Sequence, residues 1–378
     1  MSDVLFVTTS DLSGSSGNNV ATTETIAAFA RSSTYDVSVV CPAPVNEMPR
    51  KVDQKISEFH FVTPREEKSI KNHLELQLGL LFKIGSLLRR EPFDLLVIRH
   101  APAMIAPTVL AVLLGVPFVL LARGLAHERL RYSSLLRGIF RFNVRMADDV
   151  YCAYSEVVDR AAEIRSGSAS APVLFTNAVD PDEFDRYGRN DARERLGQEY
   201  DQSDFVVGFV GSLKPYHTLK KLVLAIDSLD EDTQLLVLGN GPERESLNRL
   251  VANLGLCDRV TLAGFVEHDR IDEYITACDV AYGVIDPEHP GNAIKCYEYL
   301  ACGRPVITDR RSEFEFVDEV GAGVVIDQVT VDKIEDAIRE LKSMPLRDRL
   351  EMGERGREHV LENHTWDTLV ELVADRNL

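Results

Sequence analysis

The sequence contains few cysteines, and their spacing fits neither a disulfide framework nor a metal site. Six cysteines occur among the 378 residues, and no two of them form a Cys-x-x-Cys pair. Pairs of that spacing mark zinc and redox sites, and structural disulfides belong to oxidising compartments. We therefore expect reduced, mostly buried thiols in a cytoplasmic protein.

The sequence also lacks a long uninterrupted apolar run. Its most apolar stretch, residues 101–122, contains Pro102, Pro107 and Pro117 and divides into helix-like and strand-like parts. A membrane-spanning helix needs about 20 consecutive apolar residues, so we do not expect this stretch to cross a membrane. The first residues lead directly into a strand-like run, and we expect no signal peptide.

Basic residues are outnumbered by acidic ones. The 42 Lys and Arg stand against 60 Asp and Glu, which gives a formal net charge of −18, and only 11 of the basic residues are lysine. Nucleic-acid binding depends on basic side chains that neutralise phosphates, so we expect no nucleic-acid partner. A chain of this length is too long for one ordinary core, and we expect two domains.

One stretch reverses this charge balance. Residues 123–145 contain six arginines and a single acid, Glu128, with apolar side chains interleaved among them. A basic amphipathic helix of this kind would suit contact with anionic lipid or with a lipid-phosphate acceptor. The pattern is equally typical of a core-packing helix with a solvated arginine face, and the sequence leaves both interpretations open.

Strand-like and helix-like segments alternate through both halves of the chain. This alternation predicts an α/β fold with parallel sheets covered by helices. A polar, charged segment at 186–203 separates the halves, and we place the domain boundary there. The strands are expected at 3–9, 35–41, 94–99, 117–121, 149–155, 173–177, 205–210, 233–238, 260–262, 279–285 and 305–308, and the helices at 20–30, 66–90, 103–114, 219–229, 244–254, 270–277 and 331–342.

A small-residue loop follows the first expected strand. It contains Gly14 and Gly17, which would let the backbone approach a ligand closely. The loop lacks the Gly-x-Gly-x-x-Gly pattern of dinucleotide sites, and it would also serve as a plain flexible turn.

The stretch from Pro287 to Ile307 carries the most specific chemical pattern. A helix at 292–301 follows a buried strand, so its free amides at Gly291, Asn292 and Ala293 would attract an anion at the carboxyl end of the sheet. Lys295 and Glu298 lie three residues apart and share one face. A cation beside a phosphate and a carboxylate beside vicinal hydroxyls would grip a nucleotide sugar. The alternative is an ordinary crossover helix with an exposed Lys–Glu pair.

Four short motifs now occur in order in the second half, each after an expected strand. They are Gly211-Ser212-Leu213, Leu238-Gly239-Asn240-Gly241-Pro242, Gly264-Phe265-Val266 and the block from Lys295 to Pro305, preceded by Asn177-Ala178-Val179-Asp180 with Phe184. This order resembles the family 4 retaining glycosyltransferases of GT-B architecture. The resemblance implies two Rossmann-like domains facing across a cleft: residues 1–185 for the acceptor, residues 186–355 for the nucleotide sugar, and a C-terminal helix at 356–378 that packs back on the first domain.

The resemblance also implies roles for particular residues. Glu298 matches the carboxylate that clamps the donor ribose, and Lys214 and Lys295 would contact the phosphates, so these three are the expected catalytic residues. The other residues expected to bind the donor are Gly14, Gly17, Ser212, Gly241, Val266, Gly291, Asn292 and Ala293.

The sequence departs from the family pattern at three places. The first glutamate of the family's pair falls on Pro290, and the family's Arg and Lys after the first strand of the second domain fall on Ser212 and His217. The acceptor-side histidine falls on Arg123, with His127 nearby. Lys214 and Lys295 would replace the missing phosphate contacts, and Arg123 and His127 would serve the acceptor.

The function implied by the resemblance is transfer of a sugar from a nucleotide-diphosphate sugar, of UDP or GDP type, to a glycan or lipid-linked acceptor. The resemblance alone implies retention. We expect no metal or other cofactor, because Asp180-Pro181-Asp182 belongs to the segment before the domain boundary rather than to a metal-binding loop. We expect a cytoplasmic protein, peripheral on the inner face of the membrane if residues 123–145 contact lipid. A sugar-nucleotide epimerase and a non-catalytic binding protein of the same fold remain alternatives.

Overall fold

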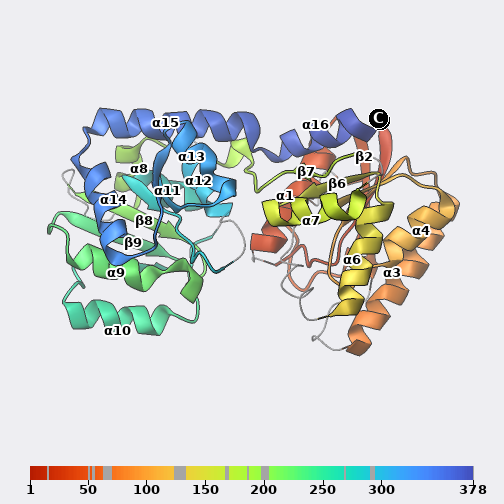
Figure 1. Cartoon of the computed structure of the whole chain (residues 1–378), viewed down its shortest axis with the longest axis horizontal. Coiled ribbons are helices and arrows are strands. Elements are labelled where there is room, and N and C mark those ends of the chain that lie inside the picture. Colours follow the sequence, from red (N-terminus) through yellow and green to blue (C-terminus); the bar gives the residue numbers. More distant parts are fainter. Residues whose placement is uncertain are drawn as a thin grey trace. The chain divides into compact units, whose positions relative to one another are not determined.

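The chain folds into two units, each built on one parallel sheet. The computed structural model describes residues 1–14, 17–49, 52, 56–62, 70–122, 133–166, 170–184, 187–196, 204–267, 270–289 and 294–377. One unit comprises Met1–Thr176 together with Trp366–Leu378, and the other comprises Asn177–Thr365. Figure 1 shows the elements of both units.

The first unit contains a seven-stranded sheet in the order β3-β2-β1-β4-β5-β6-β7. Neighbouring strands all pair in parallel. Parallel pairing requires a crossover between successive strands, which the helices supply. The strands are β1 (Ser2–Val7), β2 (Tyr35–Pro42), β3 (Glu58–Val62), β4 (Leu95–Arg99), β5 (Phe118–Ala122), β6 (Asp149–Cys152) and β7 (Val173–Leu174).

Successive residues of these strands face opposite helix layers, because side chains alternate along a strand. Leu5 and Val7 join a core formed with α3, α4, α6 and α7, whereas Phe6 packs on Phe29 of α1, with ring centroids 6.1 Å apart. The helices of this unit are α1 (Gly17–Arg31), α3 (Ile70–Arg90), α4 (Ala106–Leu114), α6 (Ser134–Met146), α7 (Ser155–Arg165) and α16 (Trp366–Asn377).

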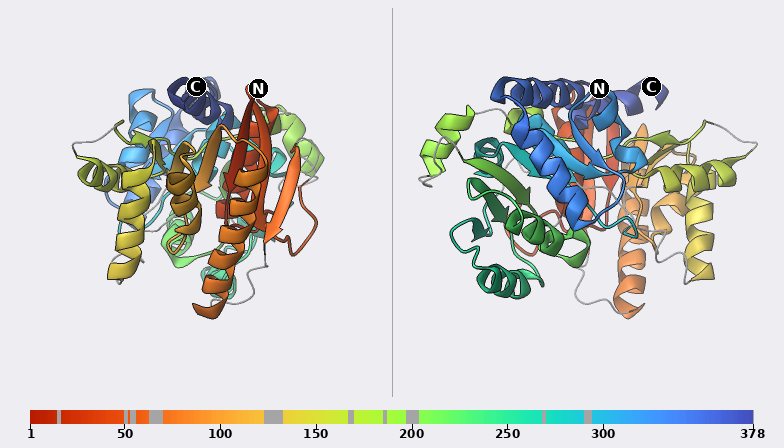
Figure 2. Two further views of the ribbon diagram at one scale, coloured as in Figure 1. Left: turned by 90° about the vertical axis from the view of Figure 1, so that its right-hand side faces the viewer. Right: turned by 60° about the vertical axis from the view of Figure 1, so that its left-hand side comes forward.

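Helix α16 returns to the first unit from the far end of the sequence. Asp367 pairs with Arg31 of α1 at 3.2 Å, and the Tyr151 hydroxyl donates to the Leu372 carbonyl at 3.0 Å. Trp366 is fully buried. Figure 2 shows α16 in dark blue near the amino end of the chain. The first unit therefore includes a helix that the sequence supplies only after the whole second unit.

The second unit contains a six-stranded parallel sheet in the order β10-β9-β8-β11-β12-β13. The strands are β8 (Phe205–Val210), β9 (Thr233–Leu238), β10 (Val260–Gly264), β11 (Val280–Tyr282), β12 (Val306–Asp309) and β13 (Gly323–Ile326). The helices are α8 (Arg189–Leu196), α9 (Leu219–Asp227), α10 (Arg244–Leu254), α11 (Ile271–Ala277), α12 (Ile294–Ala301), α13 (Glu315–Glu319), α14 (Val331–Ser343) and α15 (Leu346–Asn363).

The observed division differs from the expected boundaries at 185/186 and 355/356. The segment after Thr176 belongs with the second unit, because the Val179 amide donates to the His364 carbonyl at 2.9 Å. Helix α15 also stays with the second unit as far as Asn363, packed against α12. The sequence pattern did not predict the edge strands β3 and β13. It predicted a strand at 279–285, which is longer than the three residues of β11.

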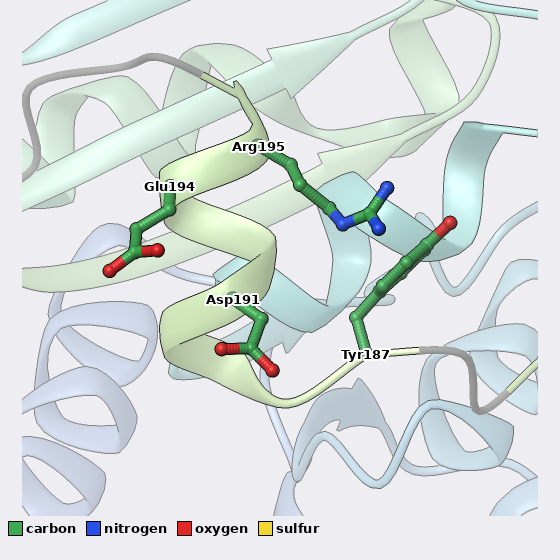
Figure 3. A pocket seen from close by; sticks show the side chains of 4 residues that line it. All are labelled: Tyr187, Asp191, Glu194 and Arg195. Atoms are coloured by element: carbon green, nitrogen blue, oxygen red, sulfur yellow. The ribbon is translucent and has the colours of Figure 1, made fainter.

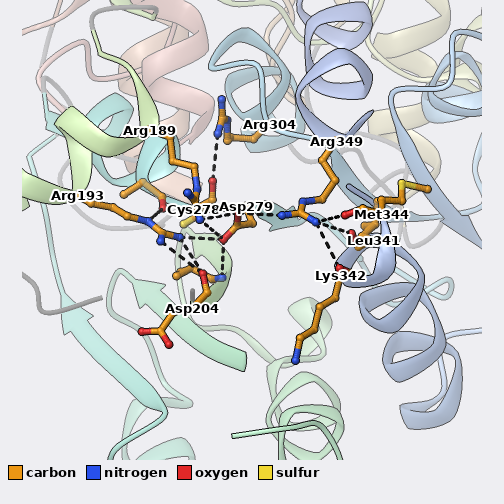
Figure 4. A network of polar contacts seen from close by, with 12 residues as sticks. Arg189, Arg193, Asp204, Cys278, Asp279, Arg304, Leu341, Lys342, Met344 and Arg349 are labelled. Carbon is orange, nitrogen blue, oxygen red and sulfur yellow. Dashed lines mark hydrogen bonds and ion pairs between the residues drawn. The ribbon is translucent and has the colours of Figure 1, made fainter. Parts of the chain in front are cut away.

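A buried cluster of charged side chains holds α8 and α15 against the amino end of the second sheet (Figure 4). Asp279, which precedes β11, is 3% exposed and accepts from the Val206 amide at 2.8 Å. Desolvation lowers the pKa of the buried arginines, and the Asp279 carboxylate opposes that shift. Its ion pairs are with Arg189 at 2.9 Å, Arg193 at 2.8 Å and Arg349 at 3.5 Å, while Arg304 donates to the neighbouring Cys278 carbonyl at 3.3 Å.

Replacing Asp279 with asparagine is expected to lower the free energy of unfolding by about 3–5 kcal/mol, because buried guanidinium groups would lose their shared carboxylate. Urea unfolding followed by circular dichroism measures this change. Asp336→Asn is the matched control, since it removes only an exposed ion pair with Lys333, which contributes little. Equal stability of the two variants would contradict the assigned role of Asp279.

Candidate functional site

The strand order of the second unit reverses direction at β8, which lies between β9 and β11. Open parallel sheets bind ligands outside the carboxyl ends of their strands at such a switch point. The loops that leave this end of β8 and β11 are residues 211–218 and 283–289. The site is therefore expected where these two loops meet.

Backbone hydrogen bonds join five loops at this end of the sheet into one structure, which we call the rim. The Asp286 amide donates to the Tyr216 carbonyl at 2.7 Å, and the Gly239 amide donates to the Gly264 carbonyl at 2.6 Å. The Ile285 amide donates to the Asp309 carboxylate at 2.8 Å. The loops of the rim are residues 211–218, 239–243, 264–266, 283–289 and 309–311.

Two glycines allow the rim loops to pack backbone against backbone. Gly239 has φ of 120°, and a Cβ there would lie 1.9 Å from the Gly211 carbonyl oxygen. A Cβ on Gly241 would lie 2.5 Å from the Leu213 carbonyl oxygen. Gly241, expected from the sequence to line a donor pocket, is thus required for contact between two loops.

Lys295, on the first turn of α12, reaches into the rim and is buried. Its Nζ lies 2.9 Å from Nδ1 of His217 and 4.2 Å from the centre of the Phe209 ring. Burial lowers the pKa of Lys295 to about 7, although the nearby Cys296 thiol and Glu298 carboxylate act in the opposite direction.

Further cationic groups surround His217. Its pKa is lowered to about 2, mainly by burial and in addition by Lys295, His289 and Lys214, so its ring is neutral. Tyr216 stacks on His289 with ring centroids 3.8 Å apart. The rim therefore gathers basic groups around a neutral histidine.

Glu298 is also buried at this end of α12. It is 8% exposed and lies one helical turn after Lys295. The next residue, Tyr299, anchors the turn, because its hydroxyl accepts from the Val210 amide at 2.7 Å. The sequence had left open an exposed Lys–Glu pair on an ordinary crossover helix, and the burial of both side chains excludes that alternative.

Two features of the rim were not predicted from the sequence. Thr218 adopts φ of 54°, a left-handed conformation that β-branched residues rarely take. Its hydroxyl hydrogen-bonds to the Tyr282 hydroxyl at 2.8 Å, which helps to hold it there. Arg311 binds the Asp309 carboxylate through Nε at 2.7 Å. Only the polar position at the end of a buried strand could have singled out Asp309.

The remaining predicted donor residues differ in exposure. Ser212 and Lys214 are exposed on the loop after β8, and Val266 is half-buried against Val206 and Leu238. Other predicted positions lie outside the described residues: Pro290, Gly291, Asn292, Ala293, Arg123 and His127.

The first unit has a comparable switch point between β1 and β4. Gly17 begins α1 there, and Gly14 closes a turn on the Asp11 carbonyl at 3.2 Å. Arg99 donates to the Asn18 side chain at 2.7 Å. Gly14 and Gly17 thus lie at the carboxyl end of this sheet, and their contact with a donor stays a prediction.

A separate open hollow of about 500 Å³ lies beside α8, lined by Tyr187, Asp191, Glu194 and Arg195. Figure 3 shows Arg195 over the Tyr187 ring, with 4.2 Å from the guanidinium carbon to the ring centre. Helix α8 binds Asp279 at the amino end of β11, so this hollow does not belong to the rim.

Two features are absent from the described residues. The part of the chain that the structure describes contains no group of three or more His, Cys, Asp or Glu side chains arranged to hold a metal ion. None of its described helices is long and apolar enough to cross a membrane.

Comparison with known proteins connects both units to sugar transfer. Residues 16–177 match the glycosyl transferase 4-like domain, and residues 191–359 match the glycosyl transferases group 1. The chain is 30% identical over 237 residues to a GDP-mannose-dependent alpha-(1-6)-phosphatidylinositol monomannoside mannosyltransferase of Mycolicibacterium smegmatis, with 58% of this chain and 61% of that protein aligned. It is 24% identical to an N-acetyl-alpha-D-glucosaminyl L-malate synthase of Bacillus anthracis, over 82% of this chain and 81% of that protein.

A solved structure shares the whole fold. Anabaena HepE, crystallised with UDP and glucose, superposes with a TM-score of 0.76 at 16% identity, covering 99% of each chain. The aligned part spans less than two thirds of the mycobacterial mannosyltransferases. The two domain matches, their order along the chain and the two parallel sheets all indicate the same family. The chain belongs to the family 4 glycosyltransferases of GT-B fold.

Proposed function

We propose that the protein transfers a sugar from a nucleotide-diphosphate sugar to a glycan or lipid-linked acceptor. The observation that carries this proposal is the set of basic groups in the rim. Lys295 is buried there beside His217, with Lys214 and His289 close enough to lower the pKa of that histidine. A diphosphate is the kind of ligand that such a concentration of positive charge recognises.

Glu298 completes the donor site in this proposal. A buried carboxylate one turn from the phosphate-binding lysine suits the vicinal hydroxyls of a ribose, because a carboxylate accepts two hydrogen bonds. The base is of UDP or GDP type, and the mycobacterial relatives, which are GDP-mannose-dependent by name, favour GDP.

The proposed mechanism stabilises the leaving diphosphate with protein cations. Negative charge grows on the diphosphate as its bond to the sugar breaks, and preorganised donors in a dry site stabilise that charge strongly. Lys295 and Lys214 would supply this stabilisation, so the reaction would not require an added metal. Transfer with retention of anomeric configuration is part of the same proposal and rests on family membership.

Glu298→Gln is expected to weaken binding of UDP or GDP by roughly tenfold, because an amide accepts ribose hydroxyls less strongly than a carboxylate does. Isothermal titration calorimetry measures the dissociation constant. Glu358→Gln, an exposed glutamate of α15, is the matched control and should bind like the unaltered protein. Unchanged nucleotide affinity in the Glu298 variant would remove that residue from the donor site.

Incubation with nucleotide sugars separates transfer from the two alternatives. Transfer requires an acceptor, an epimerase converts the sugar nucleotide without one, and a binding protein leaves it unchanged. Consumption of donor only when acceptor is present is the expected result.

The acceptor is proposed to be lipid-linked, approached through α6. Arg137, Arg141 and Arg145 recur every fourth residue and are exposed, and Leu135 of the same helix is 71% exposed. Phe140 and Val144 of the same helix are buried in the core. The helix thus packs on the core with one face and carries an exposed arginine stripe, so it meets the conditions of both interpretations that the sequence left open. Surface arginines with an apolar neighbour suit an anionic bilayer, in accord with peripheral attachment on the inner face of the membrane.

Replacing Arg137, Arg141 and Arg145 together with glutamate is expected to abolish co-sedimentation with vesicles that contain anionic phospholipid. Substituting Arg249, Arg339 and Arg347 of the second unit by glutamate changes the net charge equally and serves as the control. Loss of vesicle binding in both triple variants, or in neither, would contradict a specific contact through α6.

A further inference from the structure

The side chains of Lys295 and His217 meet inside the rim, although they come from different elements. Lys295 extends from α12, and His217 ends the 3₁₀ turn Pro215–His217 after β8. The Lys295 Nζ lies 2.9 Å from Nδ1 of His217, and both residues are more than nine-tenths buried. An ammonium can only donate hydrogen bonds, so the histidine ring must accept.

The rest of the lysine's surroundings is apolar or tightly packed. The face of the Phe209 ring lies 4.2 Å from Nζ, and a Cβ on Gly211 would come within 3.4 Å of it. His217 in turn packs edge-on against Phe209, with ring centroids 5.3 Å apart. His217 is therefore the described hydrogen-bond acceptor of the Lys295 ammonium.

The charged and titratable groups around this pair are basic on the two loops and acidic on α12. The turn after β8 contributes Lys214, and the loop after β11 contributes His289. Helix α12 itself contributes the Cys296 thiol and the Glu298 carboxylate. Within the described residues, Lys295 has no ion pair with a carboxylate.

We infer that His217 is a positioning residue that holds Lys295 for the donor diphosphate, and that Lys295 takes up a proton when the diphosphate binds. This inference rests on the proposed function. The proton comes from solvent and adds to the neutral amine, and the phosphate charge then stabilises the ammonium.

The direction of the effect follows from the charges. Burial lowers the pKa of Lys295 to about 7 in the free protein, and a bound anion raises it again. Above pH 7 the amine must gain a proton on binding, so affinity falls as pH rises, by up to about tenfold per pH unit. Without an acceptor at position 217 the buried ammonium is less stable, which moves the onset of proton uptake to lower pH.

Calorimetric titration with UDP-glucose and with GDP-mannose, in pairs of buffers with different ionisation enthalpies, measures the protons taken up between pH 6 and 9. A nucleotide sugar has no terminal phosphate, so its diphosphate does not itself titrate in this range. The unaltered protein is expected to show uptake that rises through a midpoint near pH 7. Lys295→Met should bind more weakly and show no uptake, whereas Lys333→Met, at an exposed position of α14, should match the unaltered protein.

The histidine is tested by two substitutions of similar size. His217→Leu removes the acceptor but keeps the site dry, and should lower the uptake midpoint and weaken binding by roughly tenfold. His217→Gln keeps an acceptor and should restore both properties. Nucleotide-sugar binding without proton uptake, or with a midpoint that His217→Leu leaves unchanged, would overturn this inference and leave the proposed function intact. Binding of neither nucleotide sugar would overturn both.

Discussion

The parallel pairing of β8 with β9 on one side and β11 on the other is the constraint on which the second unit depends. It sends the two loops that follow β8 and β11 to the same end of the sheet. Successive crossovers run away from β8 in opposite directions, which makes that end the place where open parallel sheets bind ligands. The side chains assigned to the donor lie on the first of these loops and on helix α12, which follows the second.

Buried charged side chains have different partners at the two ends of this sheet. At the amino end, the Asp279 carboxylate and several backbone carbonyls bind the arginines of α8 and α15. At the carboxyl end, Lys295 has an uncharged histidine as its described partner. The arginines form ion pairs with Asp279, whereas Lys295 forms no ion pair with a described carboxylate, which distinguishes a structural network from a site suited to an anion.

The sequence predicted the two-domain α/β fold and the helix α10 because strand length, apolar runs and glycine spacing are local properties. Helix α10 begins and ends where its pattern does, at Arg244 and Leu254. The edge strands β3 and β13 were missed, since their pairing is decided by neighbours far along the chain. The spacing of Lys295 and Glu298 predicted that they share one face of α12, and their role in donor binding stays a prediction. The contact with His217 spans 78 residues, and the left-handed Thr218 depends on Tyr282, so neither could be derived from local pattern.

The return of α16 has a consequence for how the protein is made. During translation the ribosome releases β1 to β7 first, but the surface of β6 that receives the Tyr151–Leu372 contact stays uncovered until residues 366–377 emerge. The amino-terminal sheet therefore remains partly exposed while the second unit is synthesised. Its protection in the cell during that interval would fall to chaperones or to rapid elongation.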